Sequence, residues 1–460
     1  MAEDRTQLDK YREMTETPVE RLIIRLAIPS TISLLVTSIY NLADTYFVGQ
    51  LGNSATGAVG IVYPLMTLIQ AIGLMFGKGT GTLLGRQLGG KHNEEAEHTV
   101  AQGFIFSVLL GSALMIFGLL FINPLATLLG TTESMRPYTI VYARYILLAM
   151  PFKAAATCLS FSLRFQGYSS RATWGLACGA ILNIILDPLL ITGAGLGLAG
   201  AAIATMTGEM TSCLLLLWMC TRKGCVALRL RNMLPSLRSL VSICKNGFSS
   251  LIKNSLSSIA TILLNTAAAP FGDAVVAAFT IVSRLVHIAQ MIYFGISDGY
   301  QPVCSYNYGA RCYERIRRGY WFCLKIGTLL IILVVLSFAF SRPIIAAFRD
   351  DAQVIAVGTR ILRVQMLTLT LLPISSAGFV MLQGIGRNGP AAVLGSGRQG
   401  LFLVPLLLIL PRIWGLNGLI AVQPSSDILA ALLSALILRP NLRQLRQMEM
   451  EKLNSTTKES

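Results

Sequence analysis

The sequence predicts an all-α integral membrane protein with twelve transmembrane helices in two pseudo-symmetric six-helix bundles around a central cleft. Twelve long apolar segments, an internal repeat and a small share of charged residues support this prediction. Charged residues make up 13% of the chain and hydrophobic residues 53%. A soluble domain carries about 25% charged residues, nearly twice as many.

Each apolar segment has about 20 residues or more, enough to cross ~30 Å of hydrocarbon as a helix. The predicted spans are 22–47, 57–83, 100–122, 138–160, 172–193, 198–220, 246–269, 275–300, 320–341, 354–380, 391–411 and 414–438. They divide the chain into an N-terminal tail at 1–21, a six-helix lobe at 22–220, a basic inter-lobe loop at 221–245, a second six-helix lobe at 246–438 and a C-terminal tail at 439–460.

The second six segments repeat the first six. Glycines recur at one common offset in the pairs Gly52/Gly272, Gly79/Gly299 and Gly89/Gly309. Further along the chain, Gln166-Gly167 matches Gln383-Gly384, and Gly197 matches Gly415. Because each half has an even number of spans, both halves keep the same orientation and are related by an axis along the membrane normal. This is a transporter architecture, with substrate expected at the interface between the repeats.

The net charge of +16 is distributed unevenly along the chain. The loop after the sixth span has no acid and holds Arg222, Lys223, Arg229, Arg231, Arg238 and Lys245. The loop after the eighth span and the C-terminal tail are basic as well, whereas the alternate loops are not. Basic loops stay on the cytoplasmic side of a membrane protein, so both termini are predicted to be cytoplasmic. This pattern argues against nucleic acid as a partner.

Several kinds of chemistry have no sequence support. There is no G-x-x-x-x-G-K-[ST] phosphate-binding loop and no extramembrane stretch long enough for a nucleotide-binding domain. The three histidines, His92, His98 and His287, are too few and too dispersed for a metal site. We therefore expect no enzyme activity and no cofactor, and an ion or proton gradient as the energy source.

Acidic residues inside the spans are the strongest functional candidates, because an ionisable group in the membrane is costly unless it faces a cavity or a partner. Of the 22 acids, only Asp44, Asp187, Glu209, Asp298 and Asp427 lie in spans. Asp44 and Asp187 each lie about one turn from the outer end of their span, and Thr205 lies at a similar depth. Asn183 shares the helix face of Asp187, and Asn41 is similarly placed relative to Asp44.

Two carboxylates with amide and hydroxyl oxygens at one depth suit either of two ions. The acids could share a proton, or hard oxygen ligands could hold a sodium ion. The repeat counterparts of Asp44, Asn183 and Asp187 are Leu264, Gly400 and Val404, so the ion chemistry is expected in the first half only.

Three further sets of residues are candidates for other roles. Glu209 and Asp427 occupy equivalent positions in the two halves, which suggests a structural or lining role. Lys78 and Asp298 are also equivalent and could pair to close the cytoplasmic side. Substrate is expected against apolar and aromatic residues between the lobes, namely Tyr40, Tyr63, Met66, Met291, Tyr293 and Phe294.

Three motifs resemble the multidrug and toxic compound extrusion (MATE) family. They are Ala43-Asp-Thr-Tyr-Phe-Val-Gly-Gln-Leu-Gly52, Gly85-Arg-Gln-Leu-Gly-Gly-Lys91 and Asn183-Ile-Ile-Leu-Asp-Pro188. The resemblance covers residues 15–440 and implies a bacterial cytoplasmic membrane transporter that exports organic cations or amphipathic drugs in exchange for H⁺ or Na⁺. It also implies a cation site at Asp44, Asn183, Asp187 and Thr205, bending of the first helix at Pro29, and function as a monomer.

Alternative functions remain open at this point. A flippase for a lipid-linked precursor of related fold would need a cleft rich in basic residues, for which Lys78, Arg284 and Arg398 are the candidates. A membrane-embedded enzyme would need clustered His or Asp motifs at the membrane surface. A passive channel would transport without dependence on a counter-ion.

Overall fold

The computed structural model of the chain describes residues 2–133, 135–222, 224–226, 228, 230–348 and 351–459, which are almost entirely helical. Lys223 and Arg229 of the basic loop lie outside the described residues. The chain forms two compact units, one made of Met1–Thr17 and Ile28–Leu251, the other of Pro18–Ala27 and Ile252–Ser460.

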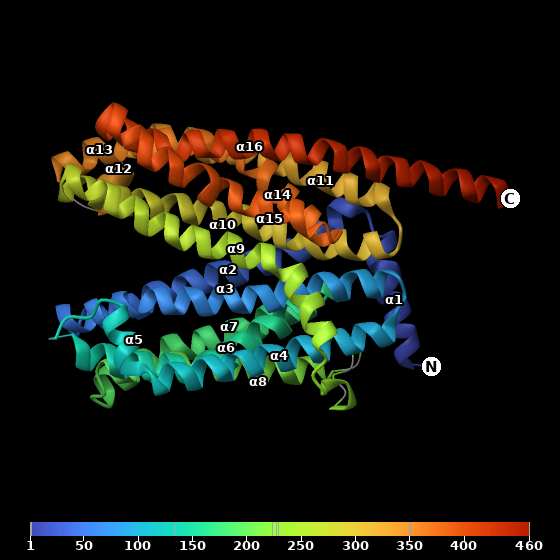
Figure 1. Cartoon of the computed structure of the whole chain (residues 1–460), viewed down its shortest axis with the longest axis horizontal. Coiled ribbons are helices and arrows are strands. Elements are labelled where there is room, and N and C mark those ends of the chain that lie inside the picture. The colour runs from blue at the N-terminus through green and yellow to red at the C-terminus, as the bar shows by residue number, and fades with distance from the viewer. Residues whose placement is uncertain are drawn as a thin grey trace. The chain divides into compact units, whose positions relative to one another are not determined.

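Unit 1 is built around one central helix. Its elements are α1 (Ala2–Glu16), most of α2 (Val19–Gly49), α3 (Asn53–Gly89), α4 (Asn93–Leu120), α5 (Ile122–Leu128), α6 (Arg136–Phe165), α7 (Ser169–Pro188), the π-helix η1 (Leu189–Gly193), α8 (Leu198–Cys220), the short η2 (Leu230–Met233) and the start of α9 (Leu237–Ala268). Helix α6 packs against α3, α4, α7 and α8 (Figure 1). Its buried Ala154, Ala155 and Ala156 let neighbouring backbones approach closely.

Unit 2 contains the rest of α9, η3 (Ala269–Phe271), α10 (Asp273–Gly309), α11 (Tyr313–Gly327), α12 (Leu330–Phe348), α13 (Ala352–Leu369), α14 (Leu372–Gly384), α15 (Asn388–Ser396), the π-helix η4 (Gly397–Phe402) and α16 (Leu403–Glu459). Helix α10 packs against α11, α13 and α14, and α13 also packs against α12 and α16. A core of buried apolar side chains from α9, α10, α13 and α16 fills this unit.

All twelve predicted spans are helical. Nine helices of the described chain are long and apolar enough to cross a membrane, and α13 with α14, bent by 48°, supplies a tenth span. Helix α9 matches the predicted span 246–269 but is more polar, since it carries Asn246, Lys253 and Asn254. One of these nine helical segments, Asn388–Asn454, contains the last two predicted spans. The two spans meet at Gly415, whose backbone is not helical, with φ 54° and ψ −132°.

The backbone carries the repeat as well. Gly197 has the same φ of 54° as Gly415, and Lys91 and Arg311 are both left-handed, with φ of 60° and 57°. One predicted register is wrong: Gly167, with φ 83°, corresponds to Gly386, with φ 82°, rather than to Gly384. Backbone conformation identifies the turn, whereas the Gln-Gly dipeptide recurs two residues earlier in the second half. In the shifted register the repeat counterparts of Asn183 and Asp187 are Phe402 and Leu406, so neither residue has a polar counterpart in the second half.

Helices extend beyond the predicted spans because hydropathy marks the hydrocarbon region and not the helix ends. The predicted N-terminal tail contains α1, where Lys10 Nζ lies 4.5 Å from the Tyr168 ring centroid. The predicted C-terminal tail continues α16 without a break, and the Arg317–Glu449 ion pair at 3.0 Å fastens it to α11. The predicted loop 221–245 is shorter than expected, since α9 begins at Leu237.

Helices α2 and α9 each divide between the two compact units. Helix α2 changes unit between Ala27 and Ile28, next to Pro29, and α9 changes between Leu251 and Ile252. The predicted lobes at 22–220 and 246–438 therefore differ from the compact units at these two helices.

Glycine permits a very close approach of α3 and α9 within unit 1. A Cβ atom at Gly247 would lie 1.8 Å from the backbone oxygen of Met75, and one at Gly79 would lie 2.3 Å from that of Ile243. These obstacles are backbone atoms, so only movement of a whole helix could relieve the clash.

We expect Gly247→Ala to lower the thermal unfolding temperature of the purified protein, because overpacking costs about 1–3 kcal/mol. Gly60→Ala in α3 is the matched control, since a Cβ there meets nothing within 4 Å and alanine favours a helix over glycine by up to about 1 kcal/mol. Thermal unfolding of both variants is measured by intrinsic fluorescence. Equal unfolding temperatures would contradict the close packing of α3 and α9.

Candidate functional site

Four of the predicted cation-site residues come together in unit 1. Asp44 comes from α2, Asn183 and Asp187 from α7, and Thr205 from α8, and all four side chains are buried. The Asn183 Nδ2 atom donates a hydrogen bond to Thr205 Oγ1 at 3.3 Å, which joins α7 to α8. The two carboxylates lie close enough to interact electrostatically.

The oxygens of this group have unused hydrogen-bonding capacity. Asp44 Oδ1, Asn183 Oδ1 and both carboxylate oxygens of Asp187 are buried without a hydrogen-bond partner among the described residues. A buried carboxylate without compensation costs several kcal/mol, and two neighbouring ones repel each other as well. Two protons would neutralise both carboxylates, whereas one Na⁺ would offset one of their two charges, and the oxygens present are those that a hard cation prefers.

Tyr142 on α6 belongs to the same region, although sequence reasoning did not select it. Its side chain is fully buried and its hydroxyl has no hydrogen-bond partner among the described residues. It lies close enough to interact electrostatically with Asp44, Asp187 and Tyr40. Nothing in its sequence surroundings separates it from other span tyrosines, so only the packing of α6 reveals it.

Two other predicted residues of the first helix are not part of this buried group. The side chain of Asn41 is exposed, and Asn41 uses its backbone oxygen to accept a hydrogen bond from Thr45 Oγ1 at 2.8 Å. Helix α2 is continuous through Pro29. The Pro29 carbonyl accepts a 2.7 Å hydrogen bond from Thr173 Oγ1 on α7, which fastens the two helices at this point.

Glu209 is part of an intramembrane ion pair with a residue that was not predicted. Lys153 Nζ on α6 lies 2.5 Å from Glu209 Oε1 on α8. Tyr40 on α2 lies close enough to interact electrostatically with both of them and with Asp44. A lysine inside the span 138–160 is as costly to bury as an acid, so its position in the sequence could have identified Lys153.

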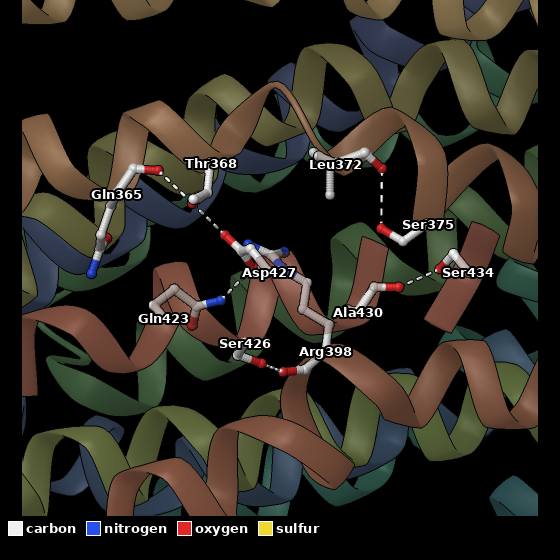
Figure 2. Close-up of polar contacts among 10 residues, drawn as sticks. All are labelled: Gln365, Thr368, Leu372, Ser375, Arg398, Gln423, Ser426, Asp427, Ala430 and Ser434. Carbon is white, nitrogen blue, oxygen red and sulfur yellow. Dashed lines mark hydrogen bonds and ion pairs between the residues drawn. The ribbon is translucent and has the colours of Figure 1, made fainter. Parts of the chain in front are cut away.

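Asp427, the repeat counterpart of Glu209, has a different environment in unit 2. Its Oδ1 atom accepts hydrogen bonds from Arg398 Nε at 2.6 Å and Gln423 Nε2 at 2.8 Å (Figure 2). Its Oδ2 atom accepts one from Thr368 Oγ1 at 2.8 Å. Both oxygens are occupied, in contrast to those of Asp187. The Arg398 guanidinium is thereby neutralised, which removes one basic candidate of the flippase alternative.

The remaining predicted lining residues differ in exposure. Tyr63 is exposed, whereas Met66, Met291 and Phe294 are half-buried. Tyr293 requires a correction: it is fully buried and its hydroxyl donates to the Cys323 carbonyl at 3.3 Å, so it presents no surface to a substrate here. The Tyr293 ring packs in the core of unit 2, and the hydrogen bond of its hydroxyl group satisfies the polar end of the side chain there.

The predicted gate residues lie in different units. Lys78 on α3 has its Nζ 5.4 Å from the Phe161 ring centroid, and Asp298 lies on α10. Their pairing stays a prediction.

Similarity to known proteins agrees with this architecture. The chain is 27% identical over 438 residues to the multidrug export protein MepA of Staphylococcus aureus strain MSSA476, covering 93% of this chain and 96% of MepA. It is similar to the crystal structure of MATE in complex with MaL6, with a TM-score of 0.90, 27% identity and coverage of 95% and 99%. It is also similar to an outward-facing multidrug resistance MATE family transporter, with a TM-score of 0.88, 27% identity and coverage of 95% and 98%.

The MatE family model matches residues 29–189 and 249–407, one stretch in each half of the repeat. These two stretches make up more than half of the 460 residues. The chain therefore belongs to the MatE family and is a multi-pass membrane transporter of the multidrug and toxic compound extrusion type.

Proposed function

We propose that this transporter exports organic cations or amphipathic drugs in antiport with H⁺ or Na⁺. The main support is the group of buried oxygens in unit 1, where Asp44 Oδ1, Asn183 Oδ1 and both oxygens of Asp187 lack hydrogen-bond partners among the described residues. The relative MepA, named a multidrug export protein, supports the substrate class. The bacterial relatives also support a location in the cytoplasmic membrane. We propose that the protein is a monomer there and that both termini lie on the cytoplasmic side.

The coupling ion acts by reducing the negative charge that Asp44 and Asp187 carry together. Two ionised carboxylates in a dry, partner-poor environment repel each other and resist close packing of α2 against α7 and α8. Entry of H⁺ or Na⁺ lowers this cost and stabilises a packed arrangement of the three helices. An ion can drive such a change only by binding the two arrangements with different affinity. Such repacking would bend α2 at Pro29, because helices kink at proline, and the hydrogen bond from Thr173 fastens α2 to α7 at this same residue.

Efflux driven by separate gradients tests this function. We expect vesicles containing the wild-type protein to expel a fluorescent organic cation when one of the two gradients, sodium or proton, is imposed. The other gradient, imposed alone, should drive efflux less well. Asp187→Asn should reduce gradient-driven efflux by at least about tenfold, since it removes one of the two carboxylates that take up the ion. Asp273→Asn, in the exposed first turn of α10, is the matched control. Normal efflux by Asp187→Asn, independent of both gradients, would refute antiport through this site.

A direct binding measurement distinguishes the two ions. If the ion is Na⁺, Asn183→Ala removes an oxygen ligand and should weaken sodium binding by about tenfold, or ~1.4 kcal/mol, in a calorimetric titration. If the ion is H⁺, the same variant should retain proton uptake, whereas Asp44→Asn should lose it. Sodium binding that is unchanged in both variants would exclude this group as the sodium site.

Asp427 is expected to stabilise unit 2 rather than to couple transport. Asp427→Asn leaves the half-buried Arg398 without its counter-charge, and removal of one partner from a buried ion pair typically costs about 3–5 kcal/mol. The thermal unfolding temperature should fall while the ion affinity of the folded protein stays at the wild-type value. Loss of ion binding without loss of stability would show instead that Asp427 belongs to the coupling machinery.

A further inference from the structure

Unit 1 contains a second polar cluster that the ion site does not use. It consists of Lys153 on α6, Glu209 on α8, and Tyr40 and Tyr63 on α2 and α3. Among the described residues, the strong polar contact of this cluster is the 2.5 Å bond between Lys153 Nζ and Glu209 Oε1. Tyr40 lies close enough to interact electrostatically with Lys153, Glu209 and Tyr63. Three of these four residues were expected to line a substrate site.

The Glu209 carboxylate is less completely satisfied than its repeat counterpart. Asp427 receives three hydrogen bonds and its side chain is 7% exposed. From the part of the chain that the structure describes, Glu209 receives one hydrogen bond, donated by Lys153, and the Glu209 and Lys153 side chains are 17% and 18% exposed. No hydrogen bond from a described residue reaches Glu209 Oε2. A ligand could therefore reach this carboxylate, whereas the Asp427 carboxylate is closed by its own neighbours.

The aromatic residues beside Glu209 give the cluster the chemistry of an organic-cation site. A carboxylate attracts the positive charge, and the face of a tyrosine ring attracts a quaternary or alkylated cation. Tyr63, which is 62% exposed, offers such a ring without being part of the core. A proton or a small metal ion binds to oxygen atoms and does not require aromatic rings, so the cluster favours a large, soft cation.

Lys153 has the properties of an exchangeable partner. A lysine ammonium is a compact charge on a flexible four-carbon stem, whereas arginine makes a rigid, bidentate pair. Lys153 has one bond to Glu209 and no second carboxylate bonded to it among the described residues, so a cation that takes its place at Glu209 replaces one ion pair with another. Its charge also matches the one that an organic cation would bring to Glu209.

We propose that Glu209 receives the positive charge of the transported organic cation, and that Lys153 is a tethered competitor that occupies this carboxylate when substrate is absent. The inference rests on the proposed function for the class of substrate. Lys153 keeps the empty site electrically neutral, and the substrate must displace it. The affinity for a cation is thereby lowered, which favours release of the substrate after transport.

Equilibrium binding of tetraphenylphosphonium to the purified full-length protein tests this inference without requiring transport. Lys153→Met removes the competitor and should tighten binding by about tenfold, whereas Glu209→Gln should weaken it by about tenfold. The double variant should behave like Glu209→Gln, because the competitor acts only through Glu209. Binding of uncharged triphenylphosphine oxide should be the same in all four proteins. Structural damage by Lys153→Met would weaken binding, so tighter binding cannot arise from it.

Lys325→Met, which removes a positive charge from an exposed position of α11 in unit 2, is the matched control and should bind like the wild type. Lys153→Met that binds no more tightly than the wild type, or Glu209→Gln that binds as tightly, would overturn the inference. Gradient-driven efflux by the wild type would leave the proposed function intact in that case. If neither the wild type nor Lys153→Met binds any organic cation, both proposals fail.

Discussion

An ionised side chain inside a membrane needs a counter-charge, several hydrogen bonds or a bound ion, and this requirement organises the polar interior of the protein. Asp427 meets it with Arg398, Gln423 and Thr368 and is closed to further partners. Glu209 meets it with one lysine. Asp44 and Asp187 have oxygens that no described residue satisfies. The three environments form a series from permanently compensated, through exchangeable, to dependent on an external ion.

Helix α6 joins these requirements to the packing of unit 1. It supplies the closely packed alanines of the core, the buried Tyr142 beside the two aspartates, and Lys153 beside Glu209. Tyr142 and Lys153 lie on this one helix, on either side of Pro151, so α6 links the ion site to the Glu209 cluster. Movement of α2, which carries Asp44 and Tyr40, would then change both sites together.

The fold could be predicted from the sequence because hydropathy and the repeat of glycines are patterns of the linear chain, and neither depends on tertiary contacts. Sequence reasoning also grouped Asp44, Asn183, Asp187 and Thr205, since helical rise alone gives the depth of a residue in a membrane. It did not find Tyr142 or exclude Asn41, because rotation of a helix about its axis depends on its neighbours. It treated Glu209 and Asp427 as equivalent, but their charged partners lie in spans that are not equivalent, Lys153 in the fourth and Arg398 in the eleventh.

The division of α2 and α9 between the compact units has a consequence for the chain as a polymer. Each unit contains a short helical piece, Pro18–Ala27 or the stretch from Leu237 to Leu251, whose covalent continuation belongs to the other unit. If the two sequence repeats were produced as separate polypeptides, neither would carry all the residues of a complete unit. Each half would have to borrow a helical segment from the other, as in reciprocal segment exchange, and neither would be expected to fold fully alone.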